Sequence, residues 1–292
     1  MFNHNWLKVF RLREIFVGVS PIIIASLDFH KFLDPVRFLI LVGGFYAIFI
    51  SSFLINELVD SFDTDQFNPE REKGITKHGV SRQFTLVAFV SWSIVGILLL
   101  SLLGLVWIAL TGFLLLFLYS VPPVRIKARP FFDLVAVTLG FVIFPYLSFS
   151  ILVAQNPSIP VGLILAFFAS GFMAIDLVAE GADFDADKKA GLQTTAVFLG
   201  EKKNLQAIQF LYLISTILGA VAIIITGHWW YLYLIAMTFF LFTASRFGLS
   251  IVGQKERLHE LLRTGERFGI FVSGLGTVIA IIIFICASVW PF

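Results

Sequence analysis

The chemistry in this sequence is concentrated in two acidic clusters. The first lies at 56–65 and begins inside an apolar segment, and the second lies at 176–187, where another apolar segment ends. Both clusters supply oxygen ligands and contain neither His nor Cys. Such ligands suit Mg²⁺, which keeps several waters and takes one or two carboxylates while substrate phosphate completes its shell. Two facing clusters therefore predict two ions that bind a diphosphate between them.

Helical spacing predicts which side chains of the first cluster point the same way. At about 100° per residue, Asn56, Asp60 and Asp63 fall on one helical face, while Asp65 points away. Like charges one turn apart repel each other, and ionisable groups at a membrane boundary also lose hydration. We therefore expect a cation among these oxygens.

The second cluster shows the same spacing. Asp176, Glu180, Asp183 and Asp187 share a helical face, and Asp185 opposes them. Either cluster alone could consist of solvated loop acids. Both clusters, however, lie at helix ends on the same predicted side of the chain, which favours a shared site.

A short basic stretch separates the two clusters. Arg125, Lys127 and Arg129 alternate with apolar residues after Pro122 and Pro123, which end a helix and stiffen the loop. In an extended stretch the three cations would point the same way and hold a polyanion. They also fit the ordinary excess of basic residues in a cytoplasmic loop, so that alternative stays open.

Composition identifies the elements that position these residues. Hydrophobic residues make up 58% of the 292 residues and charged residues 14%, whereas soluble domains carry about 25% charged residues. We predict an all-α polytopic membrane protein, a bundle of nine transmembrane helices in a single domain, 1–292. The predicted spans are 16–29, 38–59, 84–103, 105–120, 131–153, 160–177, 204–226, 229–244 and 268–287.

The basic residues give an orientation for this bundle. Of the 21 Lys and Arg residues, all but Lys31 and Arg37 fall in the N-terminal tail or in alternate connections. By the positive-inside rule, the N-terminus and both acidic clusters face the cytoplasm in the cytoplasmic membrane. The net charge of +2 is small and gives no reason to expect a nucleic-acid partner.

In these motifs the chain resembles the UbiA superfamily of intramembrane prenyltransferases, which have nine membrane helices. That superfamily carries a first motif NDxxDxxxD, a second motif DxxxD and often YSxPPxxxK between them. The matching stretches here are Asn56-Glu-Leu-Val-Asp60, Asp183-Phe-Asp-Ala-Asp187 and Tyr119-Ser-Val-Pro-Pro-Val-Arg-Ile-Lys127. The resemblance covers nearly the whole chain.

Two positions depart from the first motif. Glu57 replaces the usual second Asp, and the usual third Asp falls on Thr64, between Asp63 and Asp65. Helical geometry favours Asp63 as the ligand. One inserted residue would align Asn68-Pro69 better with the family and would favour Asp65.

The resemblance implies an Mg²⁺-dependent enzyme that transfers a prenyl group from an allylic prenyl diphosphate to a lipophilic acceptor within membrane lipid. The implied metal ligands are Asn56, Asp60, Asp63 (or alternatively Asp65), Asp183 and Asp187. The implied diphosphate-binding residues are Lys127, Arg125, Arg71 and Tyr119. Catalytic roles would fall on Asp60, Asp183 and Lys127.

The acceptor is less constrained by these motifs. The stretches 68–74 and 119–133 look most like the lycopene elongase branch, which acts on carotenoids. Aromatic quinone precursors and glycerol ether lipids remain alternatives. A cation-binding transporter is the alternative of another class, but transporters place charged sites near mid-membrane, whereas these acids lie at one face.

Overall fold

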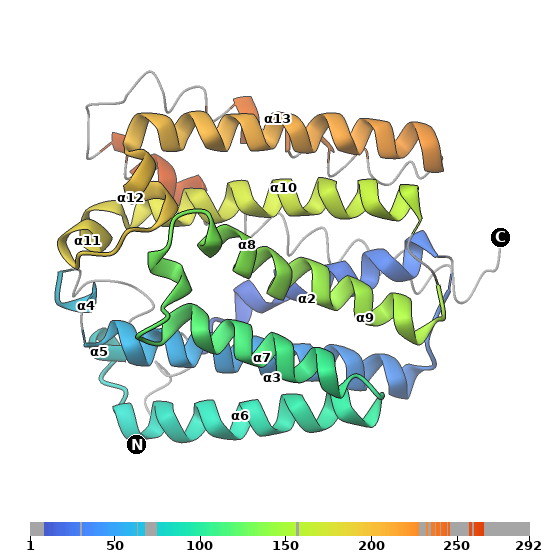
Figure 1. Ribbon diagram of the computed structural model, residues 1–292, viewed down its shortest axis with the longest axis horizontal. Coiled ribbons are helices and arrows are strands. Elements are labelled where there is room, and N and C mark those ends of the chain that lie inside the picture. Colours follow the sequence, from blue (N-terminus) through green and yellow to red (C-terminus); the bar gives the residue numbers. More distant parts are fainter. Residues whose placement is uncertain are drawn as a thin grey trace.

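The computed structural model describes residues 9–29, 31–62, 64–67, 75–155 and 158–227, and scattered positions between 232 and 265. Every regular element within these residues is helical, as predicted (Figure 1). The elements are α2 (Leu12–Asp28), α3 (Pro35–Asp60), α4 (Thr64–Phe67), α5 (Ile75–His78), α6 (Arg82–Leu102), α7 (Val106–Ser120), η1 (Ile126–Ala128), α8 (Phe132–Thr138), η2 (Leu139–Ile143), α9 (Phe144–Leu152), α10 (Ile159–Ala182), α11 (Phe184–Lys189), α12 (Thr195–Leu199) and α13 (Glu201–Thr226).

Local sequence sets where the long helices begin. The side chains of Asp34, Ser81 and Ser158 accept backbone N–H groups at the N-termini of α3, α6 and α10, and Thr194 does so for α12. These caps satisfy donors that have no partner inside the helix. At the other end of α13, Gly227 takes a left-handed conformation and ends the helix.

Five helical segments are long and apolar enough to cross a membrane, namely α3, α6, the continuous run from α8 to α9, α10 and α13. α7 and the apolar part of α2 are shorter. The predicted spans from the first to the seventh each fall on described helices, and the boundary between the third and fourth is a turn at Gly104. Half of the residues of the eighth predicted span and all of the ninth lie outside the described residues.

The long helices pack closely through small residues. α3 lies along α6, and α10 lies along α13 (Figure 1). A Cβ placed on Gly96 of α6 would lie 2.8 Å from a side-chain carbon of Ile48 and 3.0 Å from the carbonyl oxygen of Gly44, both on α3. Small residues allow such close approach, a pattern common between membrane helices.

The outer faces of these helices are apolar. The exposed large side chains include Leu98 of α6, Trp107 of α7, and Phe210, Ile217 and Ile224 of α13. A hydrocarbon environment tolerates such a surface, whereas water does not. The apolar surface and the long apolar helices together fit an integral membrane protein.

The two ends of the bundle differ. At one end, tight connections join α2 to α3, α6 to α7 and α9 to α10. At the other end, α3, α7 and α10 finish, and the short helices α4, α11 and α12 gather beside them (Figure 1, left). The residues singled out from the sequence therefore meet at a single end.

Candidate active site

The first acidic motif forms one wall of a pocket at the C-terminus of α3. Asn56 and Asp60 lie one turn apart, and the Asn56 amide nitrogen donates to Asp60 Oδ2 at 3.0 Å. Asp60 is the last residue of α3 and is 3% exposed. The helix was expected to continue through Asp63, and that expectation is wrong, because the chain turns at Ser61 and Phe62.

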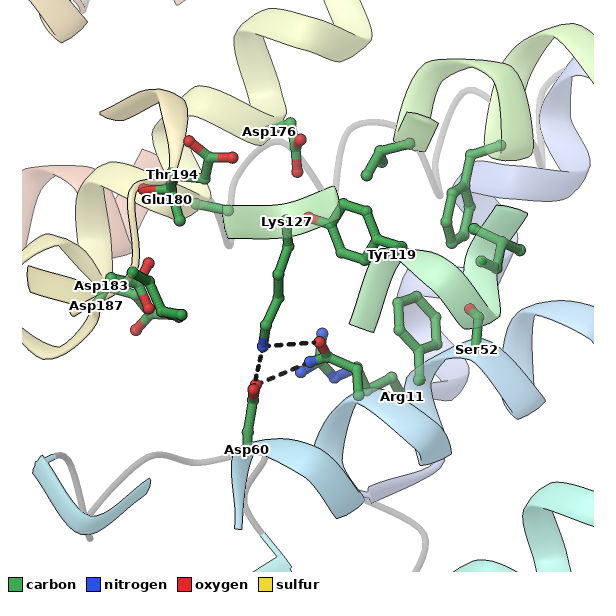
Figure 2. Close-up of a pocket in the computed structure, with 17 residues that line it drawn as sticks. Arg11, Ser52, Asp60, Tyr119, Lys127, Asp176, Glu180, Asp183, Asp187 and Thr194 are labelled. Atoms are coloured by element: carbon green, nitrogen blue, oxygen red, sulfur yellow. Dashed lines mark hydrogen bonds and ion pairs between the residues drawn. The ribbon is translucent and has the colours of Figure 1, made fainter. Parts of the chain in front are cut away.

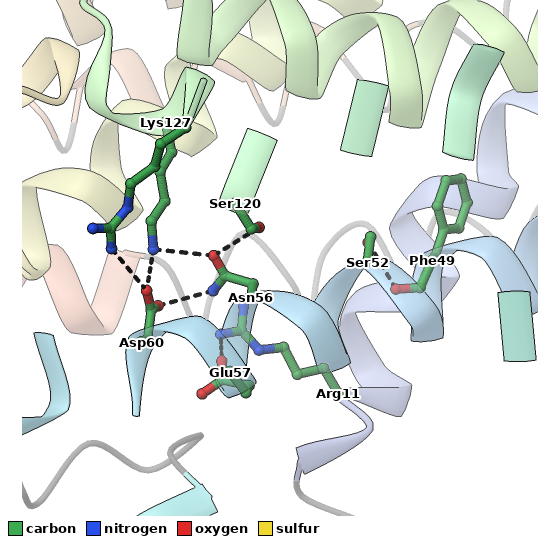
Figure 3. Close-up of polar contacts among 9 residues, drawn as sticks. Arg11, Phe49, Ser52, Asn56, Glu57, Asp60, Ser120 and Lys127 are labelled. Carbon is green, nitrogen blue, oxygen red and sulfur yellow. Dashed lines mark hydrogen bonds and ion pairs between the residues drawn. The ribbon is translucent and has the colours of Figure 1, made fainter. Parts of the chain in front are cut away.

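Two basic side chains from the loop after α7 meet this wall (Figure 3). The Lys127 ammonium group donates to Asp60 Oδ1 and to Asn56 Oδ1, the latter at 3.2 Å. The Arg125 guanidinium lies 3.7 Å from the same Asp60 oxygen, and Ser120 Oγ donates to Asn56 Oδ1 at 3.2 Å. Lys127 and Asp60 are both buried, so their charges are paired away from bulk water, with Arg125 as a second cation beside Asp60.

The expected row of cations is wrong in part. Residues 126–128 form a turn of 3₁₀ helix, and Arg125 has a left-handed backbone with φ +40°, so the stretch is not extended. Arg125 and Lys127 converge on Asp60, whereas Arg129 is exposed and its Nε donates to the Val124 carbonyl at 2.9 Å. Alternation along an extended strand does not apply to this compact turn.

The second acidic motif forms the opposite wall. α10 ends at Ala182 and α11 follows directly, with Asp183 between them. Asp176, Glu180, Asp183 and Asp187 all line the pocket, as their helical spacing predicted (Figure 2).

Backbone N–H groups at the start of α12 donate hydrogen bonds to two carboxylates at the second wall. The buried Asp133 carboxylate accepts the Thr195 backbone N–H at 2.6 Å and the Thr195 hydroxyl. The Ala196 backbone N–H donates to Glu180 Oε2 at 2.9 Å. These contacts join the end of the basic loop to the start of α12. We did not assign this role to Asp133 from the sequence, because its partner lies 62 residues away.

The pocket between the walls has a volume of about 170 Å³ (Figure 2). Its mouth is charged, and its inner part is lined by Phe53, Leu116, Val137 and Phe141. The short π-helix η2 carries Phe141, whose ring stacks on Phe49 with centroids 4.4 Å apart. A charged mouth above an apolar interior suits a molecule with an anionic head and a hydrocarbon tail.

The residues present fit Mg²⁺. Among the described residues, those lining the pocket include five carboxylates, from Asp60, Asp176, Glu180, Asp183 and Asp187, and two basic side chains, from Arg11 and Lys127. Among the described residues, no three Asp, Glu, His or Cys side chains group closely enough to hold an ion alone. An ion here would therefore need water or substrate phosphate as further ligands, which is how Mg²⁺ usually binds.

The remaining predicted site residues fall in three places. Tyr119, at the end of α7, lines the pocket. Asp65 is buried in α4, which lies against α11, instead of pointing away as helical spacing suggested. Asp63 and Arg71 lie outside the described residues.

Comparison with known proteins identifies the fold and the family. The sequence model of the UbiA prenyltransferase family matches residues 17–258. The chain belongs to this family. The matched region contains both acidic motifs and the basic loop between them.

Two curated proteins that resemble this chain carry the same name. A lycopene elongase/hydratase from Haloarcula japonica is 28% identical over 183 residues, which cover 60% of this chain and 57% of that protein. Another protein of that name, from Haloferax volcanii, is 25% identical over 245 residues, covering 74% of this chain and 77% of the relative. The first of these alignments thus spans little more than half of the relative's length.

A solved UbiA structure matches over most of its length. The UbiA homologue from Archaeoglobus fulgidus bound to GPP and Mg²⁺ superimposes with a TM-score of 0.66, covering 94% of this chain and 99% of that one. At 16% sequence identity, this likeness shows the shared fold.

One contact at the pocket involves the departure from the UbiA first motif. Glu57, at the second motif position, is fully buried and accepts a hydrogen bond from the Arg11 guanidinium (Figure 3). Sequence reasoning counted Arg11 only among the cytoplasmic basic residues. No short-range signal could have paired it with Glu57, because the two lie 46 residues apart.

Proposed function

We propose that this protein is an Mg²⁺-dependent prenyltransferase that moves a prenyl group from an allylic prenyl diphosphate to a carotenoid. The observation that carries the proposal is the pocket itself. The first acidic motif with Lys127 forms one wall, the second acidic motif forms the facing wall, and the interior is apolar. Such a site would hold a diphosphate at its mouth and a hydrocarbon chain within.

In this proposal, Asn56, Asp60, Asp183 and Asp187 would hold Mg²⁺, with Asp63 or, alternatively, Asp65 of α4 as a further ligand. The first four residues offer oxygen ligands from both walls of the pocket. The chemistry that Mg²⁺ supplies when bound is neutralisation of charge on the departing diphosphate. Asp60 and Asp183 would therefore be essential for turnover.

Lys127, Arg125 and Tyr119 would bind the diphosphate itself, with Arg71 as a further candidate. Lys127 now donates to Asp60 and Asn56, and Arg125 lies beside the same carboxylate. A diphosphate between the walls would offer these cations phosphate oxygens in exchange. Charge-assisted hydrogen bonds that strengthen as negative charge develops on the leaving group would lower the barrier to its departure.

The apolar interior would protect the allylic cation that remains. Phe53 and Phe141 present aromatic rings to the pocket, and Leu116 and Val137 complete an apolar lining. Aromatic faces attract positive charge, and an apolar lining keeps water from the cation before the acceptor reaches it.

The identity of the acceptor follows from the relatives. The curated proteins named above are lycopene elongase/hydratases, and lycopene is an uncharged polyene. An electron-rich double bond at the polyene end can attack an allylic cation directly. Aromatic quinone precursors and glycerol ether lipids are the alternative acceptors.

We also propose the topology predicted from the sequence, with nine transmembrane helices in one domain, 1–292, and the pocket facing the cytoplasm. Ser158 and Lys189 are exposed and lie near opposite ends of the α10–α11 arm. After Cys286 is replaced, Ser158→Cys should react with an impermeant thiol reagent in intact cells. Lys189→Cys should react only after the inner face is opened, and the reverse pattern would overturn the orientation.

The function is tested by a donor and acceptor screen on purified protein in lipid nanodiscs. Prenyl diphosphates of different length are offered with lycopene, 4-hydroxybenzoate or a glycerol ether acceptor. We expect diphosphate release and a longer carotenoid, both lost with EDTA and restored by Mg²⁺. Turnover with an anionic acceptor while lycopene is inert would reject the carotenoid and keep the prenyltransferase. Turnover unaffected by EDTA would reject the metal.

A further inference from the structure

The N-terminal segment contributes one charged side chain, Arg11, to the lining of the pocket. Arg11 immediately precedes α2, and its side chain is 11% exposed and lines the pocket (Figure 2). Its guanidinium donates to Glu57 Oε1, and the Glu57 side chain has no exposed surface. Arg11 thus lines the pocket beside Phe53 and Asn56, and its partner Glu57 lies behind it in α3.

Several contacts fix this guanidinium in place. Its central carbon lies 5.0 Å from the centroid of the Phe53 ring, a cation–π distance. The preceding residues, Val9 and Phe10, are both buried. Arg11 itself has a left-handed backbone with φ +48°, a conformation that a side-chain-bearing residue keeps only when its surroundings enforce it. The guanidinium is therefore held by more than its carboxylate partner.

The pairing decides which charge the pocket offers a second molecule. Arg11 paired with Glu57 adds no net positive charge, and Lys127 and Arg125 are directed at Asp60. The other charged groups lining the pocket are carboxylates. A second anionic molecule beside the diphosphate would therefore meet no uncommitted cation among these residues. A neutral molecule needs no cation and would bind without one.

We propose that the Arg11–Glu57 pair is a specificity determinant, in which Glu57 neutralises Arg11 so that the pocket accepts an uncharged acceptor and rejects an anionic one. This inference rests on the proposed function and names the residues that select its acceptor class. Asp at position 57 would be one methylene shorter, so Glu57→Asp should weaken the pairing and lie between the wild type and Glu57→Gln.

Glu57→Gln tests the proposal by removing the neutralising charge while keeping the side-chain size. The probe is radiolabelled 4-hydroxybenzoate, and its binding is measured by equilibrium dialysis with the protein in nanodiscs, without any turnover. We expect Glu57→Gln to bind the probe about tenfold or more tightly than the wild type, because the guanidinium held by Phe53 can now pair with the benzoate.

The matched control is the double variant Arg11→Met/Glu57→Gln, which has neither charge. It should bind 4-hydroxybenzoate as weakly as the wild type, which shows that the gain comes from Arg11. Elution as a single species on size exclusion and an unchanged melting profile identify variants that remain folded. If Glu57→Gln does not remain folded, Glu57→Asp provides a milder variant. Equal binding by the wild type and Glu57→Gln, or a gain that persists in the double variant, would overturn the proposal.

A further measurement separates this idea from a role of Arg11 in donor binding. Prenyl diphosphate binding to Glu57→Gln and to Arg11→Met/Glu57→Gln is measured in the same nanodiscs, because neither variant leaves Glu57 as an unpaired buried charge. If binding by the double variant is tenfold or more weaker than binding by Glu57→Gln, Arg11 serves the diphosphate and the specificity proposal is rejected. All of these experiments measure binding and none measures turnover. A failure of the proposed prenyl transfer would therefore appear only in the turnover screen and would be distinguished from a failure of the specificity proposal.

Discussion

The two walls of the pocket are held in place by different kinds of contact. On the α3 wall, Asp60 is held by Lys127 and Arg125, which are charged side chains on flexible stems. On the α10 wall, Glu180 accepts a backbone N–H of α12, and Asp133 accepts another beside it. Side-chain cations can exchange one anion for another by rotating about their own bonds, whereas these backbone donors move only with the start of α12. The first wall is thus built to rearrange around a ligand, and the second to stay fixed.

Replacing the central carboxylate of the α3 wall should have the largest effect. Asp60→Asn keeps the side-chain shape but removes the charge that faces Lys127, and we expect kcat for diphosphate release to fall by about 100-fold or more. The measurement is phosphate-coupled turnover at saturating donor and limiting Mg²⁺.

Two further variants make this result interpretable. Asp187→Asn removes a carboxylate from the other wall, and its loss should be comparable if both walls hold the metal. Asp185→Asn makes the same chemical change at a residue of α11 outside the pocket lining, and its turnover should match the wild type. Near wild-type turnover by Asp60→Asn would disprove the assignment.

The α10 wall should respond through stability as well as activity. Asp133→Asn places an amide nitrogen or a weaker acceptor against the Thr195 donors, and we expect a loss of about 1–3 kcal/mol in the free energy of unfolding. Thermal unfolding in detergent measures this loss. We expect kcat to fall, because the α10 wall would be less well positioned. Asp133 is not a proposed metal ligand, so the Mg²⁺ concentration for half-maximal turnover should stay within about twofold.

Thr195 supplies a matched pair of variants for the same wall. Its hydroxyl donates to Asp133 and accepts the Phe131 backbone N–H at 2.6 Å. Thr195→Ser keeps both hydrogen bonds and should behave like the wild type, whereas Thr195→Val should resemble Asp133→Asn. If Thr195→Val is as stable as the wild type, the fixed character of this wall is wrong.

The sequence predicted the parts of the site that depend on helical period. Spacing within 176–187 identified Asp176, Glu180, Asp183 and Asp187 as one face, and the structure places all four in the pocket. The same logic failed after Asp60, where α3 ends, and at Arg125, whose left-handed backbone turns the basic loop. The helical period held across Asp183, because α11 follows α10 directly, and it failed where α3 gave way to a turn.

Pairings between distant residues were not predictable from one sequence. Arg11 with Glu57 and Asp133 with Thr195 join segments with no shared motif. Each pair becomes visible only when the helices are packed, because nothing in the local sequence distinguishes a paired buried charge from a solvated one. The residue types indicated the chemistry, and tertiary packing decided the partners.

Substitutions at two arginines of the basic loop should have different effects on turnover, the larger of them intermediate in size. Arg125 lies 3.7 Å from Asp60, whereas Arg129 is exposed and bonds within its own loop. We expect Arg125→Met to lower kcat/KM for the donor by about tenfold, the scale of one charge-assisted contact, and Arg129→Met to change it by less than about twofold. Equal losses would support the extended row of cations expected from the sequence.

The smallest expected effect concerns the third ligand of the first motif. Asp65 is 4% exposed in α4, which lies against α11. A carboxylate there would add one ligand to a site that already has several, so Asp65→Asn should raise the Mg²⁺ concentration for half-maximal turnover by about three- to tenfold with little change in kcat. Magnesium titration of turnover in nanodiscs measures this shift, with Asp185→Asn as the control. A larger shift for Asp63→Asn than for Asp65→Asn would instead support Asp63, the ligand that helical geometry favoured in the sequence.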